Sequence, residues 1–313
     1  MNLTNSKINQ THNQVFLTDG GIETTLIFHE GFELPYFAAF DLLRTKKGRN
    51  ALRQYFERYA ALAVNSRTGF ILESPTWRAS SDWAAKLGYN REQLARANRD
   101  AIYLLHEIRD EYAVHTSPFL ISGCIGPRGD GYQVSNAMSS EESQVYHSEQ
   151  IETFSQCSVD MVTAITMTYP AEAIGIVRAA QAFDLPVVIS FTTETDGHLP
   201  DGTSLKDAIE SVDRETGNGP AYYMINCAHP DHFRKGLEEN ASWVRRIQGV
   251  RANASRKSHA ELDEAEELDS GNPDELAQQY QKLRIQFPQF NILGGCCGTD
   301  HRHLGSISRY CCH

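Results

Sequence analysis

The chain has 313 residues, of which 41% are hydrophobic and 22% are charged, a composition that excludes a disordered protein and favours a globular one with a large core. The formal net charge of −11 argues against a nucleic-acid surface, which needs clustered Lys and Arg. No apolar stretch approaches the roughly 18 residues of a membrane span and the N-terminus is polar, so we expect a cytoplasmic protein that contacts no membrane, with residues 1–13 extended or disordered.

Short apolar, β-branched stretches alternate with longer helical patterns along the chain, which is typical of repeated βα units around a parallel sheet. Between the predicted strands, residues 50–65 and 93–112 carry apolar side chains at helical spacing. Ser139 and Glu142 predict a capping box, and Asn272 followed by Pro273 predicts another helix start. Eight strands are predicted, at residues 15–19, 69–73, 119–124, 161–166, 186–191, 222–227, 247–253 and 290–294.

Eight such units without a linker-like stretch predict a single domain of the α/β class over residues 1–313, a (β/α)₈ TIM barrel. The alternative is a doubly wound open sheet, but residues 19–25 lack the Gly-rich phosphate motif that usually follows its first strand. The acidic segment 260–269 has six carboxylates in ten residues and no metal-like spacing. It is expected to be a solvated loop or helix face without a chemical role.

Three thiols stand where predicted strands end, which is where a barrel collects its chemistry. Cys227 ends the sixth strand, and Cys296 and Cys297 follow the eighth. Thiolates favour zinc, and three protein ligands leave a fourth position open, as in catalytic sites. Two alternatives remain: inert buried side chains, which the flanking glycines argue against, and a redox pair, which lacks C-x-x-C spacing. Seven cysteines in all fit a disulfide framework poorly.

The other candidate metal ligands are given structural interpretations. Cys124 and Cys157 are expected to be small buried residues. The stretch 311–313, Cys-Cys-His, is expected to be a frayed end rather than a second cluster. His301 and His303 are expected at the surface or as caps, whereas His229 could support a metal ligand because it follows Cys227 by two positions.

Several motifs together resemble the homocysteine S-methyltransferase family over nearly the whole chain. They are Asp19-Gly-Gly, Asn226-Cys227, Gly294-Gly-Cys-Cys-Gly-Thr299, Gly126-Pro127 and Asp201-Gly-Thr-Ser204. The resemblance implies a zinc-dependent barrel in which Cys227, Cys296 and Cys297 bind Zn²⁺ and the substrate thiol takes the open position. The activity it implies is transfer of a methyl group from S-methylmethionine or S-adenosylmethionine to homocysteine, giving methionine.

The resemblance also assigns roles to residues near the strand ends. Asp19 and Glu23 are candidates to hold the substrate amino group, and Asn226 is a candidate to orient the site. The remaining expected substrate contacts are Gly20, Gly21, Thr76, Trp77, Arg78, Thr166 and Glu194.

Two departures from the family pattern concern substrate binding. After the fourth strand, where relatives commonly carry Glu-Thr, residues 164–170 contain no acid, and Glu194 is the candidate replacement from the next loop. After the second strand, Arg78 adds a cation that could bind a carboxylate. Asn253, in the region where relatives have Pro-Asn, is expected to be structural.

Other functions stay open at this point. The same chemistry could act on another small thiol or methylated sulfur compound. A zinc-dependent hydrolase is disfavoured because hydrolytic barrels prefer His and carboxylate ligands, and a zinc- or thiol-storage protein would bind metal without transferring methyl groups. The expected partners are a small thiol acceptor and a methyl donor, with no nucleic acid. A sulfonium donor is favoured because the chain has no room for folate or cobalamin domains, and assembly as a homo-oligomer is compatible with these features.

Overall fold

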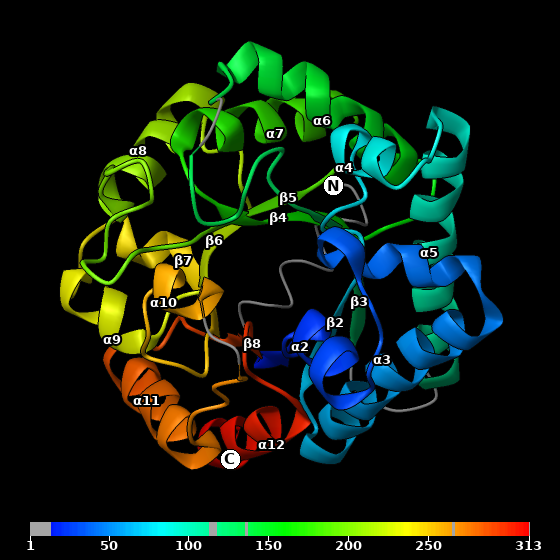
Figure 1. The fold of residues 1–313 in the computed structure, drawn as a ribbon. Coiled ribbons are helices and arrows are strands. Elements are labelled where there is room, and N and C mark those ends of the chain that lie inside the picture. Colours follow the sequence, from blue (N-terminus) through cyan, green and yellow to red (C-terminus); the bar gives the residue numbers. More distant parts are fainter. Residues whose placement is uncertain (1–13, 113–117, 135–136, 265–266, 313) are drawn as a thin grey trace.

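The chain forms a closed barrel of eight parallel strands in sequential order, seen along its axis in Figure 1. The computed structural model describes residues 14–112, 118–134, 137–264 and 267–312. A closed barrel confirms the predicted (β/α)₈ fold and excludes the doubly wound sheet. The strands are β1 (Phe16–Leu17), β2 (Gly69–Glu73), β3 (Phe119–Ile125), β4 (Met161–Met167), β5 (Val187–Phe191), β6 (Tyr222–Asn226), β7 (Ile247–Ala252) and β8 (Ile292–Gly295).

Helices surround the strands as an outer ring (Figure 1). The predictions at 50–65 and 93–112 correspond to α3 and α5, each a few residues longer than expected at its start. The predicted segment 1–13 lies outside the described residues. The helices are α2 (Ile22–Thr24), α3 (Lys46–Ser66), α4 (Ser81–Lys86), α5 (Arg91–Tyr112), α6 (Ser140–Ser155), α7 (Pro170–Ala182), α8 (Leu205–Thr216), α9 (Pro230–Phe233), α10 (His259–Asp263), α11 (Pro273–Gln286) and α12 (His301–Cys311).

Local capping explains where several helices begin. The Ser139 side chain accepts from the Glu142 N–H while the Glu142 carboxylate accepts from the Ser139 N–H, which is the predicted capping box of α6. The Asn272 side chain accepts from the first N–H groups of α11, and Pro273 occupies the first helical position. The C-terminal prediction was wrong, because α12 continues to Cys311 and Cys312 caps it rather than fraying. His313 lies outside the described residues.

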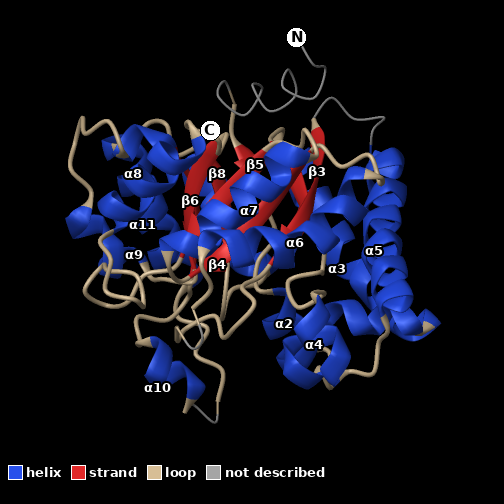
Figure 2. Cartoon of the chain, turned by 90° about the horizontal axis from the view of Figure 1, so that it is seen from above, coloured by secondary structure: helices blue, strands red, loops and turns tan. Residues whose placement is uncertain are grey.

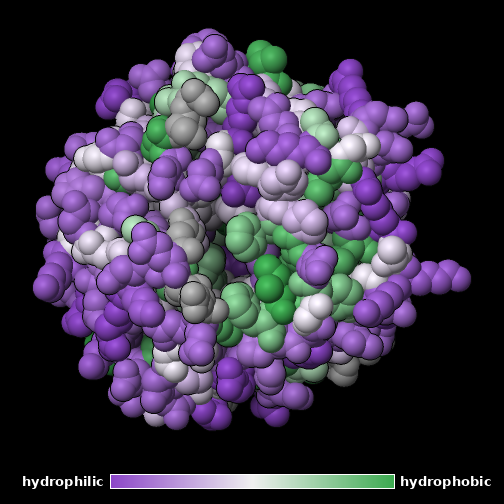
Figure 3. Space-filling view, in the orientation of Figure 1, coloured by the Kyte–Doolittle hydropathy of each residue, from purple (hydrophilic) through white to green (hydrophobic). Residues whose placement is uncertain are grey.

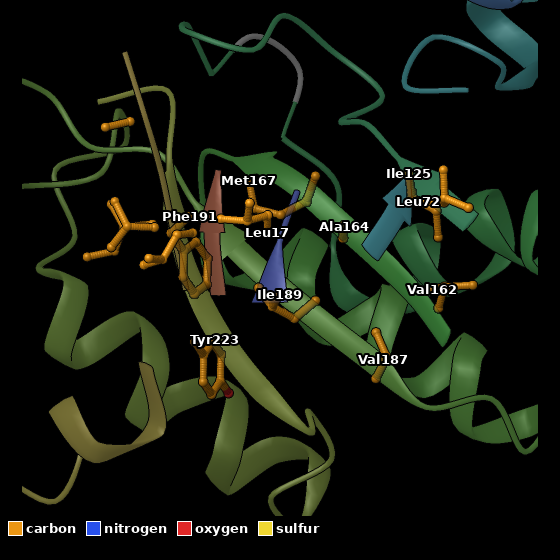
Figure 4. Packing of buried hydrophobic residues seen from close by; sticks show 14 of the residues in the cluster. Leu17, Leu72, Ile125, Val162, Ala164, Met167, Val187, Ile189, Phe191 and Tyr223 are labelled. Atoms are coloured by element: carbon orange, nitrogen blue, oxygen red, sulfur yellow. The ribbon is translucent and has the colours of Figure 1, made fainter. Parts of the chain in front are cut away.

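Two apolar layers hold the barrel together. The larger one lies between the strands and the helices, and Figure 4 shows part of it around β4 and β5, with Val162, Ala164, Val187 and Ile189 packed side by side. Alternate strand residues face the other way and form a separate cluster inside the barrel. That inner cluster consists of Phe16, Ile71, Leu120, Met161, Val188, Tyr222, Met224 and Ile292.

The loops after the strands collect at one end of the barrel. Figure 2 shows α2, α4 and α10 on the same end, and these helices follow β1, β2 and β7 respectively. In the part of the chain that the structure describes, no helix combines the length and the apolar character that crossing a bilayer demands. The carboxyl ends of the strands therefore define the face on which to look for a site.

Candidate active site

Three cysteine side chains meet at the carboxyl ends of β6 and β8. Their Sγ atoms all lie within 4.8 Å of one another, and those of Cys227 and Cys297 are 3.5 Å apart. Among the described residues, this is the one group of His, Cys, Asp and Glu side chains with metal-like spacing. Interaction with the neighbouring thiols of Cys227 and Cys297 lowers the pKa of Cys296 well below its ordinary value, and the Arg251 guanidinium adds to this effect. Hydrogen bonding to Cys296 raises the pKa of Cys227, and the pKa of Cys297 is also raised, so the negative charge of the cluster resides on Cys296.

Hydrogen bonds fix the backbone at Cys227 and at Cys296. Cys227 adopts a left-handed conformation with φ of +55°, which is costly for a residue with a Cβ. Its carbonyl accepts from Asn253 Nδ2 at 3.0 Å, which gives Asn253 the structural role expected for it. The Cys296 N–H donates to Ala252 O at 2.9 Å. Gly298, at φ of +78°, closes the loop after the pair where a side chain would be strained.

Tyr132 and His259 complete the surroundings of the thiols, and sequence reasoning missed both. The Tyr132 hydroxyl lies 3.3 Å from Sγ of Cys227 and of Cys297. The His259 ring stacks on the Tyr132 ring with centroids 4.1 Å apart, and its Nε2 lies 2.7 Å from Cys227 O. Because a carbonyl only accepts, Nε2 is the donor. A tyrosine within a Gly-Asp-Gly-Tyr stretch after β3 was the available sequence signal for this contact.

A cavity of about 360 Å³ opens onto the thiols from the barrel mouth. Figure 3 shows this face with a central hollow, and apolar side chains gather beside it. Ile27, Phe28 and Phe37 supply part of that apolar wall, and both Phe side chains are about half exposed. The predicted site residues on the cavity wall are Asp19, Gly20, Gly21, Glu23, Trp77, Arg78, Thr166, Cys227, Cys296 and Cys297.

Asp19 does not offer an unpaired carboxylate to a substrate amine, because it belongs to a buried ionic triad of Asp19, Glu73 and Arg251. Arg251 on β7 donates from Nη2 to Asp19 Oδ1 at 2.6 Å and from Nη1 to Glu73 on β2. Tyr55 also donates to Asp19 Oδ2 at 2.9 Å. Burial raises the pKa of Asp19 and of Glu73, and Arg251 opposes the effect. The triad forms the charged floor of the cavity, and sequence reasoning did not foresee Arg251 or Glu73 there.

Glu23 is the carboxylate that remains available on the wall. It sits in the first turn of α2, half-buried, and its side chain forms no ion pair within the described residues, although the Glu23 backbone hydrogen-bonds the carboxylate. Burial, helped by the charge of Cys296, raises its pKa to about 7, against the opposing effects of the Glu23 backbone hydrogen bond and of Arg78. Glu23 therefore switches between a neutral acid and an anion near neutral pH.

Asn226, at the end of β6, controls the irregular end of β4. Its Oδ1 accepts from the Thr166 N–H at 2.9 Å, and its Nδ2 donates to Thr166 Oγ1 at 2.8 Å. The same Nδ2 lies 4.0 Å from Cys296 Sγ. Thr166 has φ of +63°, an unusual value for a β-branched residue, and the strand register shifts beside it. The end of β4 therefore carries a strained threonine that is held by the Asn226 amide.

Several sequence predictions are corrected by these positions. Thr76 is fully buried and bonds Cys124 O at 2.7 Å, so it lies behind the wall rather than on it. Glu194 does not replace the missing acid, because its Oε1 lies 3.2 Å from His259 Nδ1, behind that ring. His229 supports no cysteine and instead caps α9 by accepting from the Asp231 N–H. His303 takes the capping role that was one of its two expected interpretations, because its side chain accepts from the Asp300 N–H at the start of α12, where it is buried.

Two further findings concern glycine and the acidic segment. A Cβ on Gly21 would lie 2.6 Å from the Cys296 carbonyl oxygen, so the close packing of the chain already requires a glycine here, and the expected substrate contact of Gly21 stays a prediction. The segment 260–269 is not merely solvated, because Leu262, Glu267, Leu268 and Asp269 line the cavity opposite α2. Its pattern did not reveal this, since the position depends on how the loop after β7 folds back over the mouth.

The sulfur cluster fits zinc. Tetrahedral zinc with Zn–S bonds of about 2.3 Å separates its sulfur ligands by about 3.8 Å, close to the 3.5 Å between Cys227 and Cys297. An all-sulfur donor set selects a soft ion. Cys227, Cys296 and Cys297 would hold the ion, and Asn226 and His259 would orient two of them from behind.

Comparison with known proteins agrees with this architecture. A sequence model of the family described as homocysteine S-methyltransferase matches residues 16–311. The chain is similar to the metallated form of the homocysteine methyltransferase MmuM from Escherichia coli, with 18% identity, a TM-score of 0.72 and coverage of 96% of this chain and 98% of that one. For the oxidized form the values are 18%, 0.74, 98% and 99%. At this identity the structural likeness concerns the fold, and it confirms the barrel.

Proposed function

Because the chain belongs to the homocysteine S-methyltransferase family and is therefore a methyltransferase, we propose that it methylates the thiol of homocysteine to give methionine, with S-methylmethionine or S-adenosylmethionine as the donor. The observation that carries the proposal is the trio of Sγ atoms within 4.8 Å at the floor of a cavity large enough for a small substrate. Three sulfur ligands leave a fourth position for the acceptor.

The zinc requirement is part of the proposal. Cys227, Cys296 and Cys297 would hold the zinc, which would supply a lowered pKa to the coordinated acceptor thiol, so that this thiol, otherwise mostly protonated at neutral pH, would release its proton to water. In the transfer, the acceptor sulfur forms a bond to the methyl carbon and the bond between methyl and sulfonium breaks, so the donor leaves as a neutral thioether. The protein contributes most by aligning sulfur, methyl carbon and leaving sulfur.

The residues of this chain then have separate tasks. Glu23, as an anion, would hold the substrate ammonium group beside the thiols. Trp77 is fixed by donation from its Nε1 to Ile165 O at 3.4 Å and would supply a flat wall for the donor. Asn226 would keep Cys296 oriented through its Nδ2. Ile27 and Phe28 would cover the reacting atoms and limit the access of water.

The test combines a metal assay with a methyl-transfer assay. Freshly purified reduced protein should contain about one zinc per chain and convert homocysteine to methionine with one of the two sulfonium donors. Cys297→Ser should lose both zinc and activity. The matched control is Cys157→Ser. The Cys157 thiol hydrogen-bonds to Thr153 O on α6 and does not belong to the cluster, so this variant should keep both zinc and activity.

Other results would exclude the proposal. Reduced wild-type protein without zinc would contradict the assigned metal site. Stoichiometric zinc without methyl transfer to any thiol would indicate storage, and zinc-dependent hydrolysis of an ester or amide would indicate a hydrolase. The cytoplasmic location and the homo-oligomeric state stay predictions, which cell fractionation and the solution mass would check.

A further inference from the structure

Arg78 is a buried cation without an ion pair in the described part of the chain, since Asp130 and Glu23 attract it only from beyond ion-pair distance. Its side chain is 4% exposed, and no carboxylate of the described residues lies within 4.0 Å of its guanidinium. Nη1 donates to Gly129 O at 2.9 Å, while Nε is buried without a partner. A charge removed from water is strongly destabilised unless an opposite charge or hydrogen bonds compensate it. Arg78 lines the cavity, so a cavity ligand can reach it.

Aromatic rings hold this guanidinium in a fixed plane. Its central carbon lies 3.9 Å from the ring centroid of Trp77 on one side and 3.9 Å from that of Trp83 on the other. The stacking stabilises the cation by its faces and leaves the edge free for hydrogen bonds. The Nε–Nη2 edge, which has no partner in the described part of the chain, is the edge that forks onto a carboxylate.

The other strong charges at the inner wall are already compensated. Arg251 pairs with both Asp19 and Glu73. Asp130 accepts from the N–H groups of Tyr132 and Gln133, and Asp269 accepts from Ser255 and Gly271.

This leaves Arg78 and Glu23 as the buried or half-buried charges on the cavity wall that have no ion pair in the described part of the chain. Both residues line the same cavity as Cys296, and Glu23 interacts electrostatically with Cys296 and with Arg78.

We propose that Arg78 and Glu23 form a two-charge recognition site for a free α-amino acid, in which the Nε–Nη2 edge of Arg78 binds the substrate carboxylate and Glu23 binds the ammonium. The cavity wall carries the thiol cluster, the Glu23 carboxylate and the Arg78 guanidinium, which would serve the thiol, ammonium and carboxylate groups of homocysteine respectively. The inference rests on the proposed function, and it adds that a thiol without a carboxylate is a poor acceptor. The missing acid after β4 is thereby replaced by a different clamp.

The experiment compares two acceptors in three proteins. Homocysteine and its decarboxylated analogue, aminopropanethiol, are assayed with wild type, Arg78→Met and Arg78→Lys. Arg78→Met should lower kcat/KM for homocysteine about 100-fold but change that for aminopropanethiol less than about threefold, and Arg78→Lys should recover part of the loss. The matched control is Arg128→Met, because Arg128 also lies over an aromatic ring, Tyr146, but pairs with Asp82 outside the cavity. It should leave both acceptors unchanged.

A binding measurement distinguishes failure of the recognition site from failure of the proposed methyl transfer. Calorimetry with zinc-loaded protein and homocysteine, without a donor, reports recognition independently of transfer. If wild type transfers methyl groups but Arg78→Met loses both acceptors equally, or neither, the recognition site is wrong and the function stands. If wild type binds homocysteine in an Arg78-dependent way yet transfers no methyl group, the function is wrong and the recognition site stands. Circular dichroism of each variant identifies a folding defect. If Arg78→Met does not fold, the comparison of the two acceptors in Arg78→Lys tests the recognition site.

Discussion

Asn226 binds Thr166 twice, accepting from its N–H at 2.9 Å and donating to its hydroxyl at 2.8 Å. The two residues belong to β6 and the end of β4, which are not adjacent strands, so the contact crosses the barrel mouth over β5. Ser190 on β5 donates to the same Asn226 oxygen at 2.6 Å. One amide thus organises three strand ends and lies beside Cys296.

Replacement of Asn226 by alanine should disturb both stability and activity. The variant leaves the buried Thr166 N–H without a partner, so we expect a loss of about 2–3 kcal/mol in the free energy of unfolding. Because the left-handed Thr166 also loses its support, kcat should fall. Denaturant unfolding and methyl-transfer kinetics measure the two effects. Ser190→Ala removes only one of the hydrogen bonds and should cost about 1 kcal/mol; equal effects of the two changes would contradict the central role of Asn226.

Glu23 should make homocysteine binding depend on pH. Burial raises its pKa from the ordinary 4.5 to about 7, so the anion that would hold the ammonium forms only as the pH rises through 7. We expect kcat/KM for homocysteine to rise with pH across this range, and Glu23→Gln to lose that rise together with about tenfold or more of kcat/KM at pH 8. A pH profile of Glu23→Gln that keeps the wild-type limb would assign the titration to another group.

The same shift predicts how stability changes with pH. Because the folded-state pKa lies above the unfolded one, the folded protein binds more protons between about pH 4.5 and 7. The contribution of Glu23 to the free energy of unfolding therefore falls as the pH rises through this window. Glu23→Gln should flatten that part of the stability profile, measured by denaturant unfolding at several pH values.

Arg251 should be essential for stability because it compensates two buried carboxylates. Arg251→Met leaves Asp19 and Glu73 buried without a counter-charge, and we expect a loss of about 3–5 kcal/mol in the free energy of unfolding at neutral pH. The loss should shrink at acidic pH, where the two carboxylates take up protons. Arg53→Met, which removes surface ion pairs with Glu107, should cost at most about 1 kcal/mol. A small loss at Arg251 would mean that water reaches the triad.

His259 should affect metal retention although it contacts no sulfur. His259→Phe keeps a ring against Tyr132 but removes the hydrogen bond to Cys227 O and the contact with Glu194. The Cys227 backbone would then be less firmly held in its left-handed conformation, and we expect zinc affinity to fall about 10- to 100-fold. Competition with a chelator measures this. Glu194→Gln, which keeps a hydrogen-bonding side chain beside the ring, should have a smaller effect.

The regular parts of the molecule were predictable from local patterns. Strands such as β2 and β5 are mainly apolar stretches, each with a single polar residue, and the capping box at Ser139 predicts the start of α6 to the residue. The trio of cysteines was also within reach, because a barrel brings the ends of β6 and β8 to one face. These features depend only on residues near in sequence or on the order of the strands.

The rest depends on contacts that no local pattern encodes. Arg251 interrupts the apolar pattern of β7, and only the structure shows that Asp19 and Glu73 compensate it. Glu194 was expected at the substrate because its loop follows β5. Its carboxylate instead lies against His259, the first residue of α10, which follows β7. Tyr132 reaches the thiols through the fold of the loop after β3. In each case a side chain from one loop decides the role of a residue in another.

Hydrogen bonds join the segments that follow β1 and β8, where the barrel closes. Gly295 donates to Asp19 O at 2.9 Å, Gly21 donates to Thr299 O at 3.1 Å and Gly298 donates to Thr24 Oγ1 at 3.0 Å. The conformation of the loop that carries Cys296 and Cys297 therefore depends on contacts with a segment that is synthesised some 270 residues earlier. Binding of a zinc ion by all three thiols would therefore require that β1 and β8 have already paired, so metal uptake would report the closure of the barrel.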